Sequence, residues 1–160
     1  MSLVVSDTSP IRALHFLGQI DLLHQIFGTV VIPPAVAGEL TQPRAPYEPI
    51  DASNIAFVEI REPHDDHRVR EYMITLDAGE AEALVLAIEL RATLLIDEIE
   101  GRAAAAAAGV PFIGVLGVLA RAKRDCLIDE VRPLLDRLRG ELRFRIAQPL
   151  FDQFLHSIGE

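Results

Sequence analysis

The sequence predicts an α/β protein built around a parallel β-sheet. Short apolar runs alternate with segments of helix-like periodicity, which is the pattern of βαβ units. At 160 residues the chain has the length of one compact domain with a substantial core. Its sequence shows no internal repeat and no linker that would divide it. We therefore expect a single domain over residues 1–160.

Five apolar runs are the expected strands, and they cover residues 3–5, 30–32, 55–60, 94–96 and 110–113. Turn and capping residues separate these strands from helices, which are expected over residues 11–17, 20–27, 34–40, 77–91 and 101–108. Gly109 is the expected end of the last of these helices. Three prolines exclude a regular helix from residues 41–51, and the polar residues 64–67 predict a turn. Two or three further helices are expected between residues 116 and 158.

Charge and cysteine content limit the classes of function. The formal charge of −9 argues against a generally basic surface, because nucleic-acid phosphates are normally contacted by clustered Lys and Arg. A nuclease is still compatible with this charge, since metal-binding carboxylates are neutralised by their ion. Arg102, Arg121 and Lys123 are candidate contacts to a substrate. A single cysteine, Cys126, together with no secretory leader and no apolar run of bilayer length, predicts a cytoplasmic protein without a membrane partner.

Acidic residues fall where the expected strands and helices meet. Asp7 and Asp97 directly follow apolar strands. Glu39 lies on the helix after the second strand, and Glu80 and Glu82 lie in the first turn of a long helix. Open parallel sheets bind ligands beyond the carboxyl ends of their strands, so these side chains are expected to converge. Oxygen ligands without a Cys or His cluster indicate Mg²⁺ or Mn²⁺, ions that polarise a phosphoryl oxygen during phosphodiester hydrolysis.

A structural role is the alternative for each acid, because the helix dipole alone favours Asp or Glu in a first helical turn. Asp7 is the strongest candidate for a functional role, since no helix needs its carboxylate between a buried strand and a Ser/Pro cap. His64 and His67, with Asp65 and Asp66 between them, are better explained as a solvated loop than as a metal cluster.

Four segments together resemble a known family. They read VVSDTSPI, VIPPAVAGEL, LDAGEAEALVLAIEL and LLIDEIEGRAAAAAAGVPFIGVLGVLARAKRDCLIDEVRPLLDRL. This combination is similar to the PIN-like proteins of the DUF3368 type, which are relatives of the ribonuclease toxins of bacterial and archaeal toxin–antitoxin pairs. The resemblance implies a three-layer α/β/α fold, a metal-dependent ribonuclease site that acts on single-stranded RNA, and an antitoxin partner in the wider superfamily.

The same resemblance implies a set of site residues. Asp7, Glu39, Glu82 and Asp97 match the four acids of the family, and these four are the expected metal ligands and catalytic residues. Ser9 matches the small hydroxyl residue beside the first acid. The pattern departs at Glu82, where many relatives carry Asp, so the nearby Glu80 is an alternative ligand, although taken singly it is the weakest of the candidate acids. Glu98 is a further candidate, because it follows Asp97 directly.

Three other classes of protein compete with this interpretation. A haloacid-dehalogenase-like phosphatase needs a second acid two residues after Asp7, and Ser9 stands there. A receiver domain needs paired acids after its first strand, which are absent. The third class is a catalytically weak or inactive PIN-like module that binds RNA or a protein partner, and the sequence does not distinguish it from a nuclease.

The segment over about residues 141–160 carries an apolar stripe at helical spacing. It indicates either the completion of the core or a contact between two copies of the chain. Because symmetric dimers are the commonest oligomers, we expect a homodimer.

Overall fold

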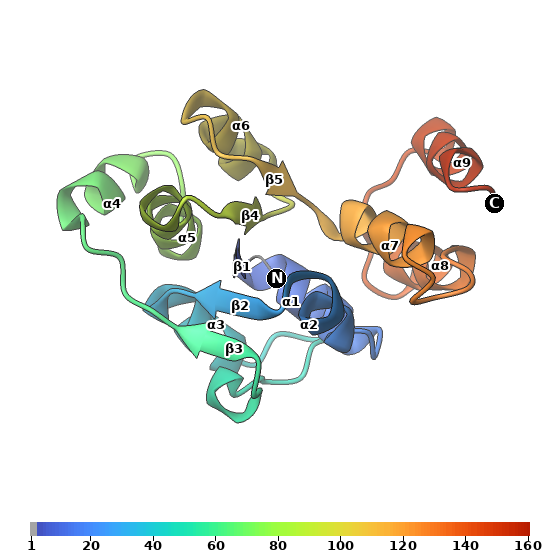
Figure 1. Cartoon of the computed structure of the whole chain (residues 1–160), viewed down its shortest axis with the longest axis horizontal. Coiled ribbons are helices and arrows are strands. Elements are labelled where there is room, and N and C mark those ends of the chain that lie inside the picture. Colours follow the sequence, from blue (N-terminus) through green and yellow to red (C-terminus); the bar gives the residue numbers. More distant parts are fainter. Residues whose placement is uncertain (1–2) are drawn as a thin grey trace.

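A five-stranded parallel sheet forms the centre of the computed structural model, which describes residues 3–160 (Figure 1). The strands are β1 (Leu3–Ser6), β2 (Thr29–Ile32), β3 (Val58–Ile60), β4 (Thr93–Leu95) and β5 (Phe112–Ile113). Their order in the sheet is β3-β2-β1-β4-β5, so that β1 is central and pairs with both β2 and β4. The carboxyl ends of β1 and β4 therefore lie side by side, because Ser6 is in register with Leu95.

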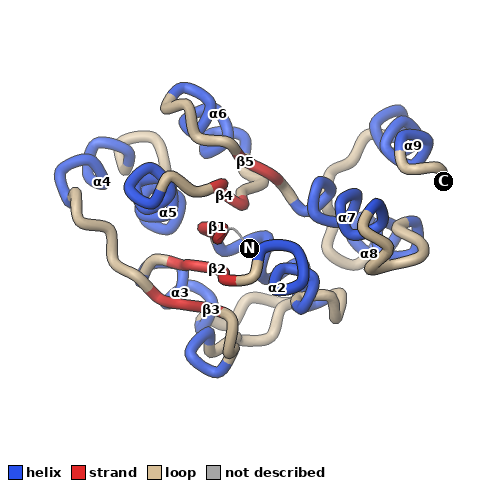
Figure 2. The backbone as a smooth tube through the Cα atoms, viewed as in Figure 1, coloured by secondary structure: helices blue, strands red, loops and turns tan. Residues whose placement is uncertain are grey.

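Helices cover both faces of the sheet, as Figure 2 shows. The helices are α1 (Thr8–Phe16), α2 (Asp21–Phe27), α3 (Pro34–Thr41), α4 (Asp66–Tyr72), α5 (Ala78–Leu90), α6 (Ile99–Ala107), α7 (Val115–Arg124), α8 (Arg132–Gly140) and α9 (Gln148–Ser157), with a short 3-10 helix η1 (Ala52–Asn54). Side chains alternate between the two faces of a strand. Val4 accordingly packs in the cluster that contains residues of α1, α2 and α7, whereas Val5 packs in the cluster formed by α4, α5 and α6.

The three-layer α/β/α architecture expected from the sequence is confirmed by this arrangement. Each expected strand is present, with ends displaced by up to three residues. The Pro-rich stretch after α3 contains an isolated bridge between Arg44 and Tyr47 but no regular strand or helix before η1. Gly109 follows α6 with a φ of +72°, a left-handed conformation that glycine adopts without the steric cost of a side chain.

One local expectation was wrong: residues 64–67 are not only a turn, because α4 begins at Asp66. The carboxylate of Asp65 accepts a hydrogen bond from the backbone N–H of Arg68 at 3.0 Å and so caps this helix. The histidines of this segment are solvent-facing, and His67 pairs with Glu71 on the same helix at 2.8 Å. The acidic pair is therefore a helix start and not a metal cluster.

Three helices, α7, α8 and α9, complete the chain beyond β5 (Figure 1). The apolar stripe of the last segment is largely covered within the chain, since Ile146, Phe151 and Leu155 are buried in the same cluster as α1 and α7. Leu150 is the exception and is half exposed. Among residues 3–160, no helix combines the length and the apolar character needed to cross a membrane.

Candidate functional site

A cavity of about 1090 Å³ opens at the carboxyl ends of β1 and β4. Its acidic wall is formed by side chains that come from widely separated parts of the chain, namely Asp7, Glu39, Asp77, Glu80, Asp97, Glu98 and Glu100. The expected acids Asp7, Glu39 and Asp97 thus face one cavity, together with the alternatives Glu80 and Glu98. Glu82 is not part of this wall.

Asp7 lies directly after β1, at the start of α1. Its backbone is extended (φ −78°, ψ 175°), and its N–H donates to the carbonyl of Leu95 at 2.9 Å, which ties it to the end of β4. The side chain is 3% exposed but makes no capping hydrogen bond to α1. Burial, together with the negative charges of Glu80, Asp77 and Glu39, raises the pKa of Asp7 to about 7, although the Thr8 amide opposes this. The carboxylate is thus held in an unfavourable position without a role in helix capping.

Glu39 projects from the last turn of α3, a helix that packs against both α1 and α5. The hydroxyl of Thr8 donates a hydrogen bond to Glu39 Oε2, which fixes the carboxylate next to Asp7. The first turn of α5 approaches it closely at Gly79. A Cβ at Gly79 would lie 2.7 Å from Glu39 Oε1, so the absence of a side chain there makes room for the carboxylate.

Asp77 and Glu80 form a capping box at the start of α5. The Asp77 carboxylate accepts from the Glu80 N–H at 2.8 Å, and Glu80 Oε1 accepts from the Asp77 N–H at 3.2 Å. Glu80 is buried, and this burial, with the nearby charges of Asp77 and Glu98, raises its pKa to about 7 against the lowering effect of the Asp77 N–H. Glu80 therefore stabilises the helix start and also adds negative charge to the cavity.

Asp97 follows β4, and its carboxylate accepts from the N–H of Val115 at 3.2 Å. Burial raises the pKa of Asp97, while the Val115 amide and the guanidinium of Arg102, 3.9 Å away, oppose the rise. A Cβ at Gly114 would lie 2.4 Å from Asp97 Oδ1, so this glycine leaves the space that the carboxylate occupies. The hydroxyl of Ser9 donates to Glu98 at 3.4 Å, so Ser9 contacts Glu98.

Glu82 lies outside the cavity wall, although the resemblance matched it to the third acid of the family. Its Oε1 accepts from the N–H of Ala35 at 3.2 Å, at the start of α3. Pro33, the residue before that helix, makes no side-chain cap of its own, so Glu82 provides one from α5. Two positions along a helix are about 200° apart around its axis, which is why Glu80 faces the cavity and Glu82 faces α3.

Asp77 and Arg12 are among the cavity residues that the sequence did not predict. The sequence indicates Asp77 as a helix start, and an N-cap at this edge of the sheet is the signal that points to the cavity. No pattern in the sequence points to Arg12. It is buried, and its guanidinium donates to the backbone carbonyls of Glu39 and Gln42, so it fixes the end of α3 that carries Glu39.

The three cations that were candidate substrate contacts have different surroundings. Arg102 lines the cavity and also donates to the carbonyl of Ile96. Arg121 and Lys123 are not on the cavity wall: the first lies over the ring of Phe27, and the second forms an ion pair with Glu160 at 2.9 Å. Only Arg102 of these three is placed to meet a ligand in the cavity.

The chemistry of the donor set fits a hard divalent cation. The cavity acids offer only carboxylate oxygens, and burial, with the negative charges of neighbouring acids, raises the pKa of Asp7, Glu80 and Asp97. The present spacing does not complete a coordination shell, since no three His, Cys, Asp or Glu side chains within residues 3–160 form a group ready to hold an ion. The residues thus fit the ion by type and charge, and the side chains would have to close around it.

The fold and the site together define a class of protein: an α/β/α layer structure with an acidic cavity at the carboxyl edge of its parallel sheet. The sequence model of the DUF3368 family, described as a PIN domain, matches residues 3–160. The chain belongs to this family. PIN domains are generally divalent-metal-dependent nucleases that bind nucleic acids. A separate search of curated proteins found no match.

Proposed function

We propose that this protein is a ribonuclease that hydrolyses phosphodiester bonds of single-stranded RNA with the help of Mg²⁺ or Mn²⁺. The observation that carries the proposal is Asp7, a buried carboxylate of raised pKa that faces other acids and caps no helix. A structural aspartate gains from hydrogen bonds or an ion pair, whereas this one is costly to ionise in its place. Carboxylates with pKa values perturbed in this way are concentrated at functional sites.

The proposed ligands of the ion are Asp7, Glu39, Glu80 and Asp97, with Glu98 at the cavity margin. Glu80 replaces Glu82 in this set, because it faces the cavity while Glu82 caps α3. When bound, the ion would neutralise the crowded charge, polarise a phosphoryl oxygen and stabilise the leaving group.

Neighbouring residues of the chain hold these carboxylates in place. Thr8 orients Glu39 by donating its hydroxyl hydrogen bond, and the Val115 N–H orients Asp97. Arg102 brings a positive charge next to Asp97, where it can pair with a phosphate of the substrate.

The test is a cleavage assay with purified protein and a labelled single-stranded RNA. We expect cleavage with Mn²⁺ or Mg²⁺ and none with EDTA, and the variant Asp7→Asn should lose it. Cleavage that persists in EDTA would contradict the mechanism.

A non-catalytic binding module is the second candidate, and the incomplete grouping of the acids favours it. It predicts RNA binding without metal binding at millimolar concentration and without cleavage. Titration calorimetry with Mn²⁺, beside the cleavage assay, separates the two candidates.

The proposed partners are RNA, an antitoxin protein and a second copy of the chain. The antitoxin rests on the resemblance to toxin–antitoxin ribonucleases, so co-purification with the product of a neighbouring gene is its test. The cytoplasmic location expected from the sequence stays a prediction.

A further inference from the structure

The segment between α8 and α9 and the start of α9 lie at the cavity, although they follow β5, the last strand of the sheet, by two helices. Phe144, Arg145, Ile146 and Leu150 all line the cavity, on a part of the chain that the sequence assigned to the core or to a dimer contact. Ile146 is buried in the main core cluster and holds this segment against the rest of the chain. The hydrogen bond from the Phe144 N–H to the Leu138 carbonyl, at 2.9 Å, fixes where the segment turns back.

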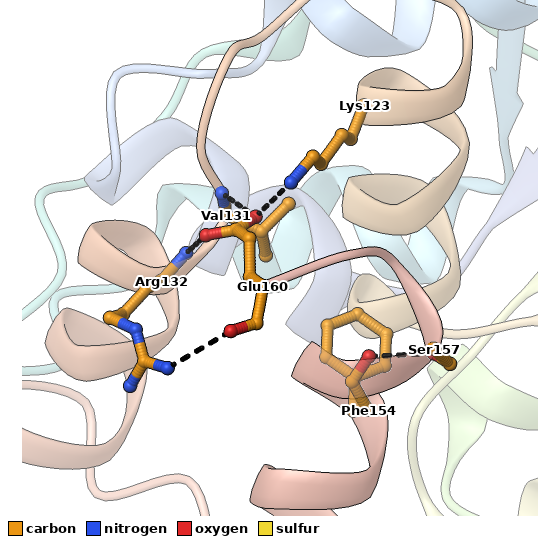
Figure 3. Close-up of polar contacts among 6 residues, drawn as sticks. All are labelled: Lys123, Val131, Arg132, Phe154, Ser157 and Glu160. Carbon is orange, nitrogen blue, oxygen red and sulfur yellow. Dashed lines mark hydrogen bonds and ion pairs between the residues drawn. The ribbon is translucent and has the colours of Figure 1, made fainter.

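Besides the burial of Ile146, a group of hydrogen bonds holds α9 and the segment that precedes it in the sequence. Figure 3 shows the carboxylate of Glu160 accepting hydrogen bonds from Val131 N–H at 2.7 Å, Lys123 Nζ at 2.9 Å and Arg132 N–H at 3.0 Å. Burial opposes the charge of Glu160, but these donors outweigh it and hold the pKa of the carboxyl below its usual range. Because Val131 precedes α8 and Lys123 lies on α7, one carboxylate fastens three helices together.

The charges around the cavity are divided between its acidic wall and a basic rim. The acids that face the ion would repel the phosphates of an RNA strand wherever the ion does not neutralise them. Arg44, from the loop after α3, and Arg145, from the returning segment, line the same cavity and are exposed. Neither arginine forms an ion pair with any residue in the range 3–160, so both charges are free to meet a phosphate.

We propose that the returning segment is a substrate-binding wall, in which Arg145 contacts a backbone phosphate of the RNA strand and Arg44 contacts another. This inference rests on the proposed ribonuclease function and assigns the strand-binding residues of that site. An arginine fork binds a phosphate through two parallel hydrogen bonds, and each such contact releases counterions from the strand. Binding should therefore depend on both arginines and on salt concentration.

The chain offers a matched control on the same segment. Arg143 is exposed like Arg145 and lies two residues away, but it does not line the cavity. Arg143→Gln and Arg145→Gln change the net charge of the protein equally, so a difference between them reports the contact and not the overall charge. Gln is as strained as Arg at the φ of +55° that residue 143 adopts, so the control leaves that cost unchanged.

The experiment measures binding of a fluorescent 12-nucleotide single-stranded RNA by anisotropy, in EDTA, between 50 and 300 mM salt. We expect Arg145→Gln and Arg44→Gln each to weaken binding at least fivefold at the lowest salt concentration. Each should also reduce the slope of log affinity against log salt by about 0.7, the value for one phosphate contact on a single strand. Arg143→Gln should change affinity less than twofold.

Equal behaviour of Arg145→Gln and Arg143→Gln would overturn the inference, and so would a wild-type protein that does not bind RNA in this assay. The proposed ribonuclease function fails separately, if the wild type binds RNA but does not cleave it with Mn²⁺ or Mg²⁺. In that case a changed affinity of Arg145→Gln still supports the binding wall.

Discussion

At the scale of single residues, Asp7 is the side chain that most strongly indicates a functional site. It is nearly fully buried, it caps nothing, and its pKa is raised to about 7 from an ordinary value of 3.8. A raised carboxyl pKa in the folded state means that folding is favoured while the group is protonated. The stability it contributes is complete below the unfolded pKa and is lost as the pH rises through about 7.

We predict that Asp7→Asn stabilises the metal-free protein at pH 8 by about 1–3 kcal/mol, because it removes this buried charge. The gain should shrink as the pH is lowered toward 5, where the wild-type carboxyl is protonated in the folded state. Denaturant unfolding in EDTA at both pH values measures this, with exposed Asp136→Asn as control. Calorimetry should show at least tenfold weaker Mn²⁺ binding, and an unchanged affinity would remove Asp7 from the site.

Glu80 and Glu82 provide the sharpest comparison within one helix turn. Glu80→Gln keeps an oxygen that can accept from the Asp77 N–H, so α5 should still form, but the cavity loses one charge. We predict at least tenfold weaker Mn²⁺ binding for Glu80→Gln. Glu82→Gln should keep full affinity, because its amide oxygen still accepts from Ala35. If calorimetry instead finds weaker Mn²⁺ binding for Glu82→Gln and unchanged binding for Glu80→Gln, Glu82 is the ligand.

Gly79 is predicted to be required for the position of Glu39. Ala is a better helix former than Gly by about 0.5–1 kcal/mol, so Gly38→Ala, with open space at its Cβ, should stabilise the protein by about that amount. Gly79→Ala should fail to show this gain and should weaken Mn²⁺ binding, because its methyl group would displace the Glu39 carboxylate. Thermal unfolding and calorimetry of both variants test this, and a parallel gain in both would contradict it.

At the scale of elements, the strands could be predicted because each is a short apolar run between polar turns. Helix α4 could not be predicted in the same way, because its polar start, with Asp65 and Asp66, has the composition of a turn. The choice between Glu80 and Glu82 could not be made from the sequence, since it depends on how α5 is rotated against the sheet. The position of Arg145 at the cavity could not be predicted from the sequence either, because it depends on how α8 and α9 pack.

The Glu160 anchor gives a prediction for α9. Glu160→Gln keeps the shape of the side chain but removes the charge that strengthens its three hydrogen bonds. We expect the backbone amides of α9 to exchange hydrogen roughly tenfold faster, a local loss of about 1–2 kcal/mol, while those of α5 stay unchanged. The exposed Glu141→Gln is the control, since within residues 3–160 Glu141 forms an ion pair only with Arg137, on the surface. Equal exchange rates of the α9 amides in the wild type, Glu160→Gln and Glu141→Gln would contradict the anchoring role of Glu160.

At the scale of the whole molecule, the expected homodimer depends on apolar surface that the fold leaves uncovered. Phe151 and Leu155 of the C-terminal stripe are buried, so they are not available to a second copy. Met73, Ile74 and Ile99 are exposed instead, and Ile74 is 83% exposed. We predict that light scattering finds a dimer and that Ile74→Lys shifts it toward monomer. A wild-type monomer at high concentration would contradict this.

The cavity takes its lining from Asp7 at one extreme and Leu150 at the other, so almost the whole length of the chain contributes to it. During synthesis the carboxylates leave the ribosome first, and the arginine of the returning segment leaves after them. A nascent chain therefore exposes acids that repel RNA before it has the wall that would hold a strand. If the proposed function is correct, strand binding can begin only after both the acids and the returning segment have been synthesised.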